Sequence, residues 1–185
     1  MSTLINLCWG WFRSPGFIVD DVENWHRALL IAGWGLKYRV QVSQESKELY
    51  SKLKGSRSPK YIIFKISDDK KQIVVEDSGD DDDYEVFRNK LIEAKDSKGK
   101  PAPRYAVYDG VFDLGTEGIR NKIVFISWVP ADTPTFSSMI YASTRETLKN
   151  ALNLSISIHA DDKDELEWAV IDDVCVGKDR KKQQA

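Results

Sequence analysis

The sequence of 185 residues contains few of the side chains that build disulfide frameworks, metal centres and hydrolytic sites. Its two cysteines, Cys8 and Cys175, cannot form a disulfide framework, which indicates a reducing compartment. Its two histidines, His26 and His159, provide no Cys/His metal set and little basis for a Ser/His/Asp arrangement. No apolar run reaches the roughly 18 residues that a membrane-spanning helix needs. These shortages argue against a disulfide-stabilised protein, a Cys/His metal protein, a Ser/His/Asp hydrolase and a protein with a membrane-spanning helix.

The motifs of nucleotide and calcium binding are missing as well. The sequence has neither a GxxxxGK[ST] loop nor a GxGxxG turn. The run Asp80–Asp83 lacks the alternating spacing and central glycine of an EF-hand loop. We interpret these aspartates as negative charges at a helix N-terminus, worth roughly 0.3–1 kcal/mol each. We therefore expect no catalytic residues, no metal and no cofactor, and a small enzyme of unknown type remains a remote alternative.

The overall composition is that of an ordinary globular chain. Hydrophobic residues make up 42% and charged residues 30%, which excludes collagen-like sequence and wholesale disorder. The net charge is −2 and the isoelectric point is near 5.8. The chain as a whole is therefore no electrostatic match for a nucleic-acid backbone, and we expect no nucleic-acid partner.

The first 40 residues differ from the rest of the chain. They include 22 residues from the AVILMFWYC set and four of the six tryptophans. A secretory signal is not expected, because Met1 to Gly10 contains no positive side chain. We interpret residues 1–39 as an atypical apolar extension, and two explanations remain open. One is a loosely docked or poorly ordered extension; the other is a segment outside the natural product, such as a wrongly predicted start or a retained intron.

From Val42 onward the pattern predicts interleaved helices and strands around one sheet. Ser43 is expected to cap a helix to about Leu53, with Gly55 as its stop. The other expected helices cover residues 83–94, 136–152 and 165–176, and the expected strands cover residues 61–66, 72–76, 104–112, 122–128 and 156–158. Residues 113–121 are expected to form a turn and residues 177–185 a charged tail. Hairpin-like connections favour a mixed sheet in an α/β (α+β type) fold.

Three motifs in order resemble one known family. They are Arg104–Asp109 (RYAVYD), Lys122–Trp128 (KIVFISW) with Pro130 after it, and Met139–Ser143 (MIYAS) followed by Arg145 and Glu146. Together with the Val42–Gly55 opening, they resemble cofilin, the actin-depolymerizing factor, most of all its fungal members. The resemblance covers residues 40–176 and implies a single actin-depolymerizing-factor homology domain. Its fold is a central mixed sheet of five or six strands flanked by helices.

The resemblance also implies two actin-binding faces. The monomer face carries over to Val42, Ser43, Met139, Arg145 and Lys149. The filament face carries over to Arg120, Lys122, Asp172 and Asp173. Each of these residues also has a purely structural interpretation. Met139 could pack in the core, and Ser43 could be a simple helix cap. The cations Arg120, Lys122, Arg145 and Lys149 could be solvated charges. The partners implied are actin monomers and filaments, for a chain that is itself a monomer in the cytoplasm, on the actin cytoskeleton and in the nucleus.

The chain departs from the family pattern at several basic positions. Family members usually carry lysine or arginine where this chain has Phe136 and Ser138, and Lys149–Asn150 replaces a basic pair. Because actin is acidic, the lost cations weaken steering and rim contacts. We expect monomer and filament binding with filament depolymerization and severing, and only weak affinity for acidic phosphoinositides. The alternative is a protein of the same fold that binds monomers or filament sides without severing.

Overall fold

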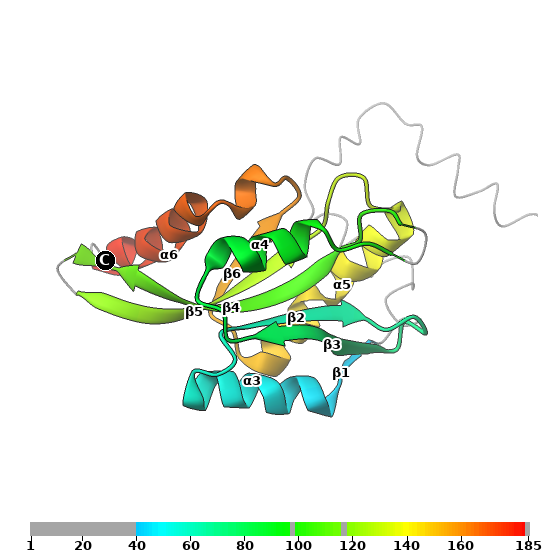
Figure 1. The fold of residues 1–185 in the computed structure, drawn as a ribbon, viewed down its shortest axis with the longest axis horizontal. Helices are drawn as coiled ribbons and strands as arrows, with labels where there is room; N and C mark the ends of the chain where they lie inside the picture. The colour runs from blue at the N-terminus through cyan, green and yellow to red at the C-terminus, as the bar shows by residue number, and fades with distance from the viewer. Residues whose placement is uncertain (1–39, 97–98, 116–117, 184–185) are drawn as a thin grey trace, which may run out of the picture. The chain divides into compact units, whose positions relative to one another are not determined.

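The computed structural model describes residues 40–96, 99–115 and 118–183, and side chains up to residue 177. The strands are β1 (Gln41–Val42), β2 (Tyr61–Ile66), β3 (Gln72–Gly79), β4 (Arg104–Asp113), β5 (Ile119–Trp128) and β6 (Ile156–Ala160). The helices are α3 (Gln44–Ser56), α4 (Tyr84–Ile92), α5 (Thr135–Leu152) and α6 (Trp168–Gln183), with a short 3₁₀ turn, η3 (Asp164–Leu166). Figure 1 shows these elements arranged around one sheet.

The six strands form one mixed sheet in the order β1-β3-β2-β4-β5-β6. The three central pairings, β3–β2, β2–β4 and β4–β5, are antiparallel, and the two outer pairings, β1–β3 and β5–β6, are parallel. The longest pairing joins β4 to β5 over ten residues, from Arg104 opposite Trp128 to Asp113 opposite Ile119. The expected mixed sheet of five or six strands is confirmed, with six strands.

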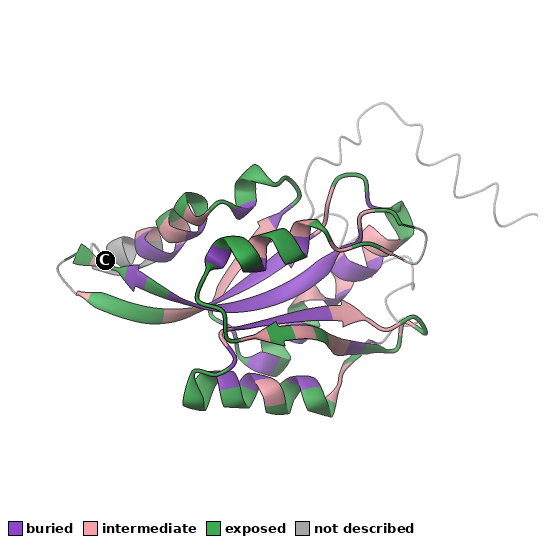
Figure 2. Ribbon diagram, viewed as in Figure 1, coloured by how far each residue is buried: buried purple, intermediate pink, exposed green. Residues whose placement is uncertain are grey.

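Helices cover both faces of the sheet, so the core has two layers (Figures 1 and 2). Side chains of a strand alternate between faces, which divides even a fully buried strand between the two layers. Tyr61 and Ile63 of β2 pack in the layer under α4 and α6, whereas Ile62 and Phe64 pack in the layer under α3 and α5. The near-continuous apolar run of β2 is explained by this double burial.

Several predicted boundaries move in the structure. Gly55 was expected to stop α3 but lies inside it, and the stop is Arg57 in the left-handed conformation, with φ of 60°. The backbone N–H of Arg57 donates to the carbonyl of Leu53, and its guanidinium binds Asp109 at 2.6 Å. These two contacts compensate for the strain that glycine would have avoided.

The β4–β5 connection and the last helix also differ from expectation. The expected turn over 113–121 is shorter, because β4 runs to Asp113 and β5 begins at Ile119. Gly118, with φ of 75°, is one residue whose positive φ the tight turn requires. The last helix begins at Trp168, after η3, and continues to Gln183, so much of the expected tail is helical. Lys, Arg and Gln in that stretch are good helix formers.

We predict that a chain starting at residue 39 keeps the fold, whereas one starting at Ser43 is destabilised. Every described element begins after residue 39, but Val40 is 3% exposed and the Gln41 N–H donates to Lys71 at 2.8 Å. Losing Val40 and β1 should cost about 2–3 kcal/mol in the free energy of unfolding. Urea unfolding of the full chain and of the two truncated chains measures this difference. Equal stability of the two truncated chains would contradict it.

Candidate functional site

The long helix α5 presents one group of predicted site residues. Met139 is half-buried and is not a member of either core layer, unlike its neighbour Ile140, which is 5% exposed. Lys149 lies further along the helix, with its ammonium 3.5 Å from Glu146. We call Met139, Arg145 and Lys149 the α5 surface. Met139 is therefore placed at the margin of the core, where it can contact both the domain and a partner.

Arg145 is more deeply engaged than a solvated charge. Its guanidinium donates to the hydroxyl of Ser157 at 3.0 Å, and its Nε is buried without a hydrogen-bond partner. The neighbouring imidazole of His159 lies 3.2 Å from the carbonyl of Ser127. Burial, followed by the Arg145 charge, lowers the pKa of His159 below its ordinary 6.5, while Asp161 and Glu165 oppose the shift. The alternative of a freely solvated Arg145 does not hold, because its side chain links α5 to β6. Contact of Arg145 with actin stays a prediction.

Val42 and Ser43 have structural roles at the start of the domain. Val42 packs against the core layer under α3 and α5. The Ser43 hydroxyl accepts from the Ser46 backbone N–H at 3.2 Å and forms a 2.8 Å hydrogen bond with the Ser46 hydroxyl. The predicted helix cap is confirmed. Contact of these two residues with actin stays a prediction.

One cation near α5 was missed by the sequence reasoning. The ammonium of Lys70, in the β2–β3 turn, lies 4.1 Å from the ring centroid of Phe136 at the start of α5. Phe136 is 39% exposed, so the stacked pair is accessible. This cation–π pair restores positive charge beside a position where α5 lacks it. Because the contact joins a turn to a distant helix, no local pattern could have indicated it.

The β4–β5 hairpin and α6 bring together the second group of predicted residues. The ammonium of Lys122, on β5, donates to the backbone carbonyl of Cys175, on α6, at 2.8 Å. Arg120 is exposed and lies two residues before Lys122 on β5. It was expected in the turn over residues 113–121 but belongs to the strand. Asp172 is half-buried and Asp173 exposed on α6. We call these four residues the hairpin–α6 surface.

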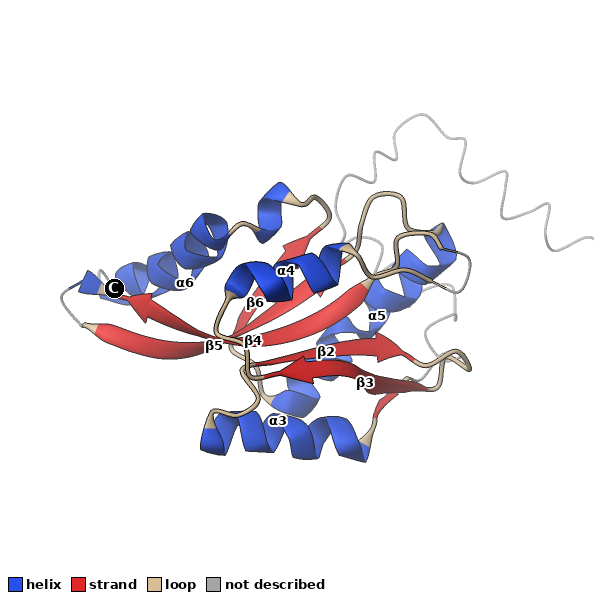
Figure 3. Cartoon of the chain, in the orientation of Figure 1, coloured by secondary structure: helices blue, strands red, loops and turns tan. Residues whose placement is uncertain are grey.

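Aromatic packing holds α6 against the hairpin. The ring of Phe112, on β4, stacks on Trp168 with centroids 5.1 Å apart and planes 17° apart. Gly110 makes this approach possible, because a Cβ there would lie 2.7 Å from Phe112 and 3.1 Å from Trp168. The hairpin and α6 therefore form one packed unit (Figure 3).

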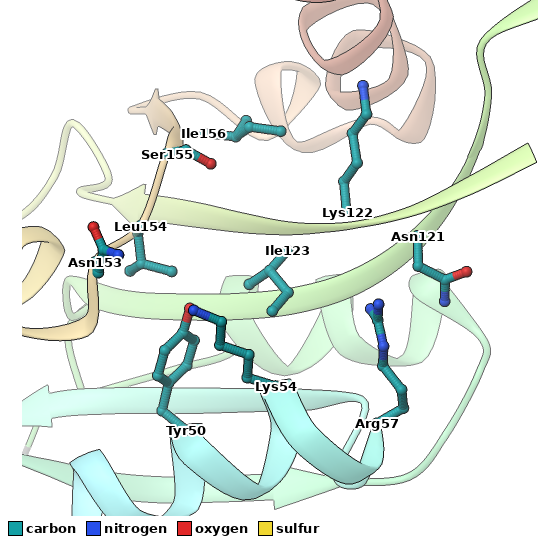
Figure 4. Close-up of a pocket in the computed structure, with 10 residues that line it drawn as sticks. All are labelled: Tyr50, Lys54, Arg57, Asn121, Lys122, Ile123, Asn153, Leu154, Ser155 and Ile156. Atoms are coloured by element: carbon teal, nitrogen blue, oxygen red, sulfur yellow. The ribbon is translucent and has the colours of Figure 1, made fainter. Parts of the chain in front are cut away.

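A cavity of about 690 Å³ lies between the α3 side of the sheet and β5, on the face of β5 opposite to α6. Figure 4 shows Tyr50, Lys54 and Arg57 projecting from the α3 side toward β5, while the ammonium of Lys122 projects away from them. The remaining lining residues come from β5 and from the connection into β6: Asn121, Ile123, Asn153, Leu154, Ser155 and Ile156. The Arg57 guanidinium pairs with the fully buried Asp109, whose second carboxylate oxygen has no hydrogen-bond partner. The lining is thus mixed: it includes three cations, Lys54, Arg57 and Lys122, together with uncharged polar and apolar side chains.

Among the residues that the structure describes, no group of three or more His, Cys, Asp or Glu side chains could hold a metal ion. Within residues 40–96, 99–115 and 118–183, no helix has the length and apolar character to cross a membrane.

Comparisons with known proteins agree with this architecture. Residues 39–175 match the family model described as cofilin/tropomyosin-type actin-binding protein. The chain is 41% identical to cofilin of Schizosaccharomyces pombe over 133 residues, which cover 71% of this chain and 91% of that protein. It is 40% identical to cofilin of Gibberella zeae, with 69% and 87% covered.

Solved structures give the same result. The crystal structure of Streptomyces griseoflavus cofilin matches with a TM-score of 0.63 at 32% identity, covering 73% of this chain and 96% of that one. A human coactosin-like protein, at 15% identity and a TM-score of 0.61, shares the fold alone. The family match, the fungal relatives and the six-stranded mixed sheet lead to one conclusion: this chain belongs to the cofilin (actin-depolymerizing factor) family of non-enzymatic actin-binding proteins.

Proposed function

We propose that the chain binds actin monomers and filaments and promotes filament disassembly. The observation that carries the proposal is the separation of two candidate surfaces on different elements of a family fold. The α5 surface lies on one helix, whereas the hairpin–α6 surface combines β5 with a helix on the other face of the sheet. One molecule can then contact two adjacent filament subunits at once.

The proposed mechanism is a shift between filament conformations. A protein that binds a twisted state of the filament more tightly than the standard state increases the population of the twisted state. Strain then collects at the boundary between twisted and standard segments, and breakage at that boundary severs the filament. The free energy for this shift comes from the difference in affinity for the two filament states, so the proposed mechanism needs no cofactor.

A second candidate function is filament-side or monomer binding without severing. It is favoured by the composition at the start of α5, where Phe136 and Ser138 replace the basic residues that family members usually carry. Lys70, stacked on Phe136, supplies one cation there. We propose that this cation retains actin binding, that affinity for acidic phosphoinositides is weak, and that the protein acts as a monomer in the cytoplasm, on the actin cytoskeleton and in the nucleus.

Three assays test the proposal. Co-sedimentation with filamentous actin and a fluorescence titration of monomeric actin measure the two binding activities. Counting filament ends by microscopy separates severing from side binding. If the protein does not pellet with filamentous actin and does not change the fluorescence of monomeric actin, both binding functions are contradicted. If binding occurs without new filament ends, the second candidate function holds.

Arg120→Glu should weaken filament binding more than monomer binding. Arg120 is exposed on the hairpin, away from α5, and its reversal replaces an attraction by a repulsion toward an acidic partner. We expect roughly a tenfold loss in filament affinity, which corresponds to about 1.4 kcal/mol. Lys122→Glu is the less clean variant, because Lys122 also holds the Cys175 carbonyl. Equal loss of both activities for Arg120→Glu would place Arg120 in a shared site.

On α5, Lys149→Ala should weaken actin binding, whereas Arg145→Ala should lower the free energy of unfolding. Lys149 makes only a long ion pair with a partly exposed Glu146 in the same helix, so its loss should weaken actin binding without changing the melting temperature. Arg145→Ala removes the bond to Ser157, and should cost about 1–2 kcal/mol in the free energy of unfolding. Thermal unfolding and monomer titration of both variants provide the comparison. Unchanged stability of Arg145→Ala would show that the link to β6 contributes nothing.

Stability should fall on acidification because of His159. Its pKa is lowered in the folded chain, so the unfolded chain binds the proton more readily. The stabilisation from the neutral imidazole is fully present above pH 6.5 and is lost as the pH falls through the lowered folded pKa. Melting temperatures at about pH 7.5 and about pH 5.5 should differ less for His159→Gln than for the unchanged chain. Identical pH dependence in both would contradict the prediction.

A further inference from the structure

The cavity beside β5 reaches the edge of that strand as well as one face. Three consecutive residues of β5, from Asn121 to Ile123, line it. Successive side chains of a strand point to opposite faces, so a hollow that meets three residues in a row must also meet the strand edge. Figure 4 agrees, because Asn121 and Ile123 point toward the α3 side whereas the Lys122 ammonium points away. The backbone of β5 therefore forms part of the cavity wall.

This edge of β5 has no strand partner among the described residues. Pairing with β6 begins at Val124, opposite Ile156, and residues 119–123 of β5 pair with β4 alone. Alternate residues of an antiparallel strand direct their N–H and C=O groups away from the neighbouring strand. Such groups on an unflanked edge can bond to an added strand, which is how extended peptides bind in β-augmentation.

Two cations face this edge from the α3 side (Figure 4). Lys54 is exposed and takes part in none of the ion pairs of the described residues. Arg57 pairs with Asp109 through one guanidinium nitrogen, and its side chain is 47% exposed, which leaves further N–H donors for an anion. Acidic side chains that point toward α3 would therefore meet donors and positive charge.

The remaining lining is largely apolar. Ile156 packs against the core layer under α4 and α6, whereas Ile123 and Leu154 pack in the layer under α3 and α5. Side chains of an added strand would alternate between the α3 side and the side of Ile156. A volume of about 690 Å³ lies within the range of ligand pockets, about 300–1,000 Å³, and suits a short segment. The matching pattern is acidic residues in alternation with apolar ones.

We propose that this cavity is the docking site for an extended, acidic segment of a partner protein, which adds to the free edge of β5 as a further strand. A phosphate group is the poorer occupant. The C-terminal ends of α3 and α5, at Arg57 and Asn153, border the cavity, and helix C-termini carry partial negative charge. A carboxylate brings less negative charge to these ends than a phosphate does. The inference goes beyond the proposed function and requires no actin.

Fluorescence anisotropy of three labelled short peptides, measured with the full chain, tests the inference. The first peptide alternates Glu with Val, the second Lys with Val, and the third Glu with Pro. We expect the Glu–Val peptide alone to bind. The Lys–Val peptide has the wrong charge for Lys54 and Arg57, and the Glu–Pro peptide lacks backbone N–H groups that a strand must donate to its neighbour.

Lys54→Glu should weaken binding of the Glu–Val peptide roughly tenfold, because it replaces an attraction by a repulsion. Lys54→Gln only removes the charge and should cost about threefold. Both losses should shrink at high salt. Lys52→Glu is the matched control, since Lys52 is exposed on the same helix, does not line the cavity and undergoes the same change of charge. The control should bind the peptide as the unchanged chain does, and melting temperatures should show that all three variants are folded.

Several outcomes overturn the inference. They are equal peptide affinity of Lys54→Glu and Lys52→Glu, no binding of the Glu–Val peptide to the unchanged chain, and equal binding of the Glu–Pro peptide, which would show attraction without strand addition. Binding of inorganic phosphate or of phosphoinositide-containing vesicles that depends on Lys54, in place of peptide binding, would identify a phosphate ligand. Concentration-dependent self-association that Lys54→Glu abolishes would identify a second copy of the chain. None of these assays contains actin, so each of these results leaves the proposed function intact.

Discussion

The ten-residue antiparallel pairing of β4 with β5 is the constraint on which the rest of the structure depends. Its inner half is buried on both faces and joins the two core layers, while its outer half projects beyond β2 and β6. A shift of register by one residue would exchange the two faces of the whole pair. Phe112 would then leave Trp168, and Lys122 would leave the Cys175 carbonyl. Core packing and the position of both hairpin faces are therefore fixed together.

Charge at the two candidate surfaces is held by structure rather than left in solvent. Arg145 is fixed by Ser157 and partly buried, Lys70 is stacked on Phe136, and Lys122 is bonded to the Cys175 carbonyl in the middle of α6. A side chain that is already fixed loses less conformational entropy on binding than a free one. If these side chains contact actin as proposed, such preorganisation would offset part of the affinity lost through having fewer cations than the family resemblance implies. Arg120 is the exposed cation among them, whereas Lys149 is half-buried.

Local patterns predicted most of the fold and only part of the site. The Ser43 cap, the buried run of β2 and the α5 stripe of Ile140, Leu148 and Leu152 depend on residues near one another in the chain, so the sequence carried their signal. The true stop of α3 depends on a bond from Arg57 to Asp109, 52 residues away. The Lys70–Phe136 pair and the Arg145–Ser157 bond likewise join separate elements. Spacing within one element cannot report such contacts.

One strand connects the two candidate surfaces, and this bears on how binding could change a filament. Tyr105, near the start of β4, donates its hydroxyl to the Tyr141 carbonyl of α5 and is 2.7 Å from the Thr144 hydroxyl. Phe112, near the end of β4, stacks on Trp168 of α6. Tyr105, Tyr141, Thr144 and Phe112 are buried and Trp168 is half-buried, so α5 and α6 are held at a fixed relative position through β4. Two surfaces held rigidly favour the filament state whose subunits match their spacing, whereas a flexible link would accept either state and shift neither population.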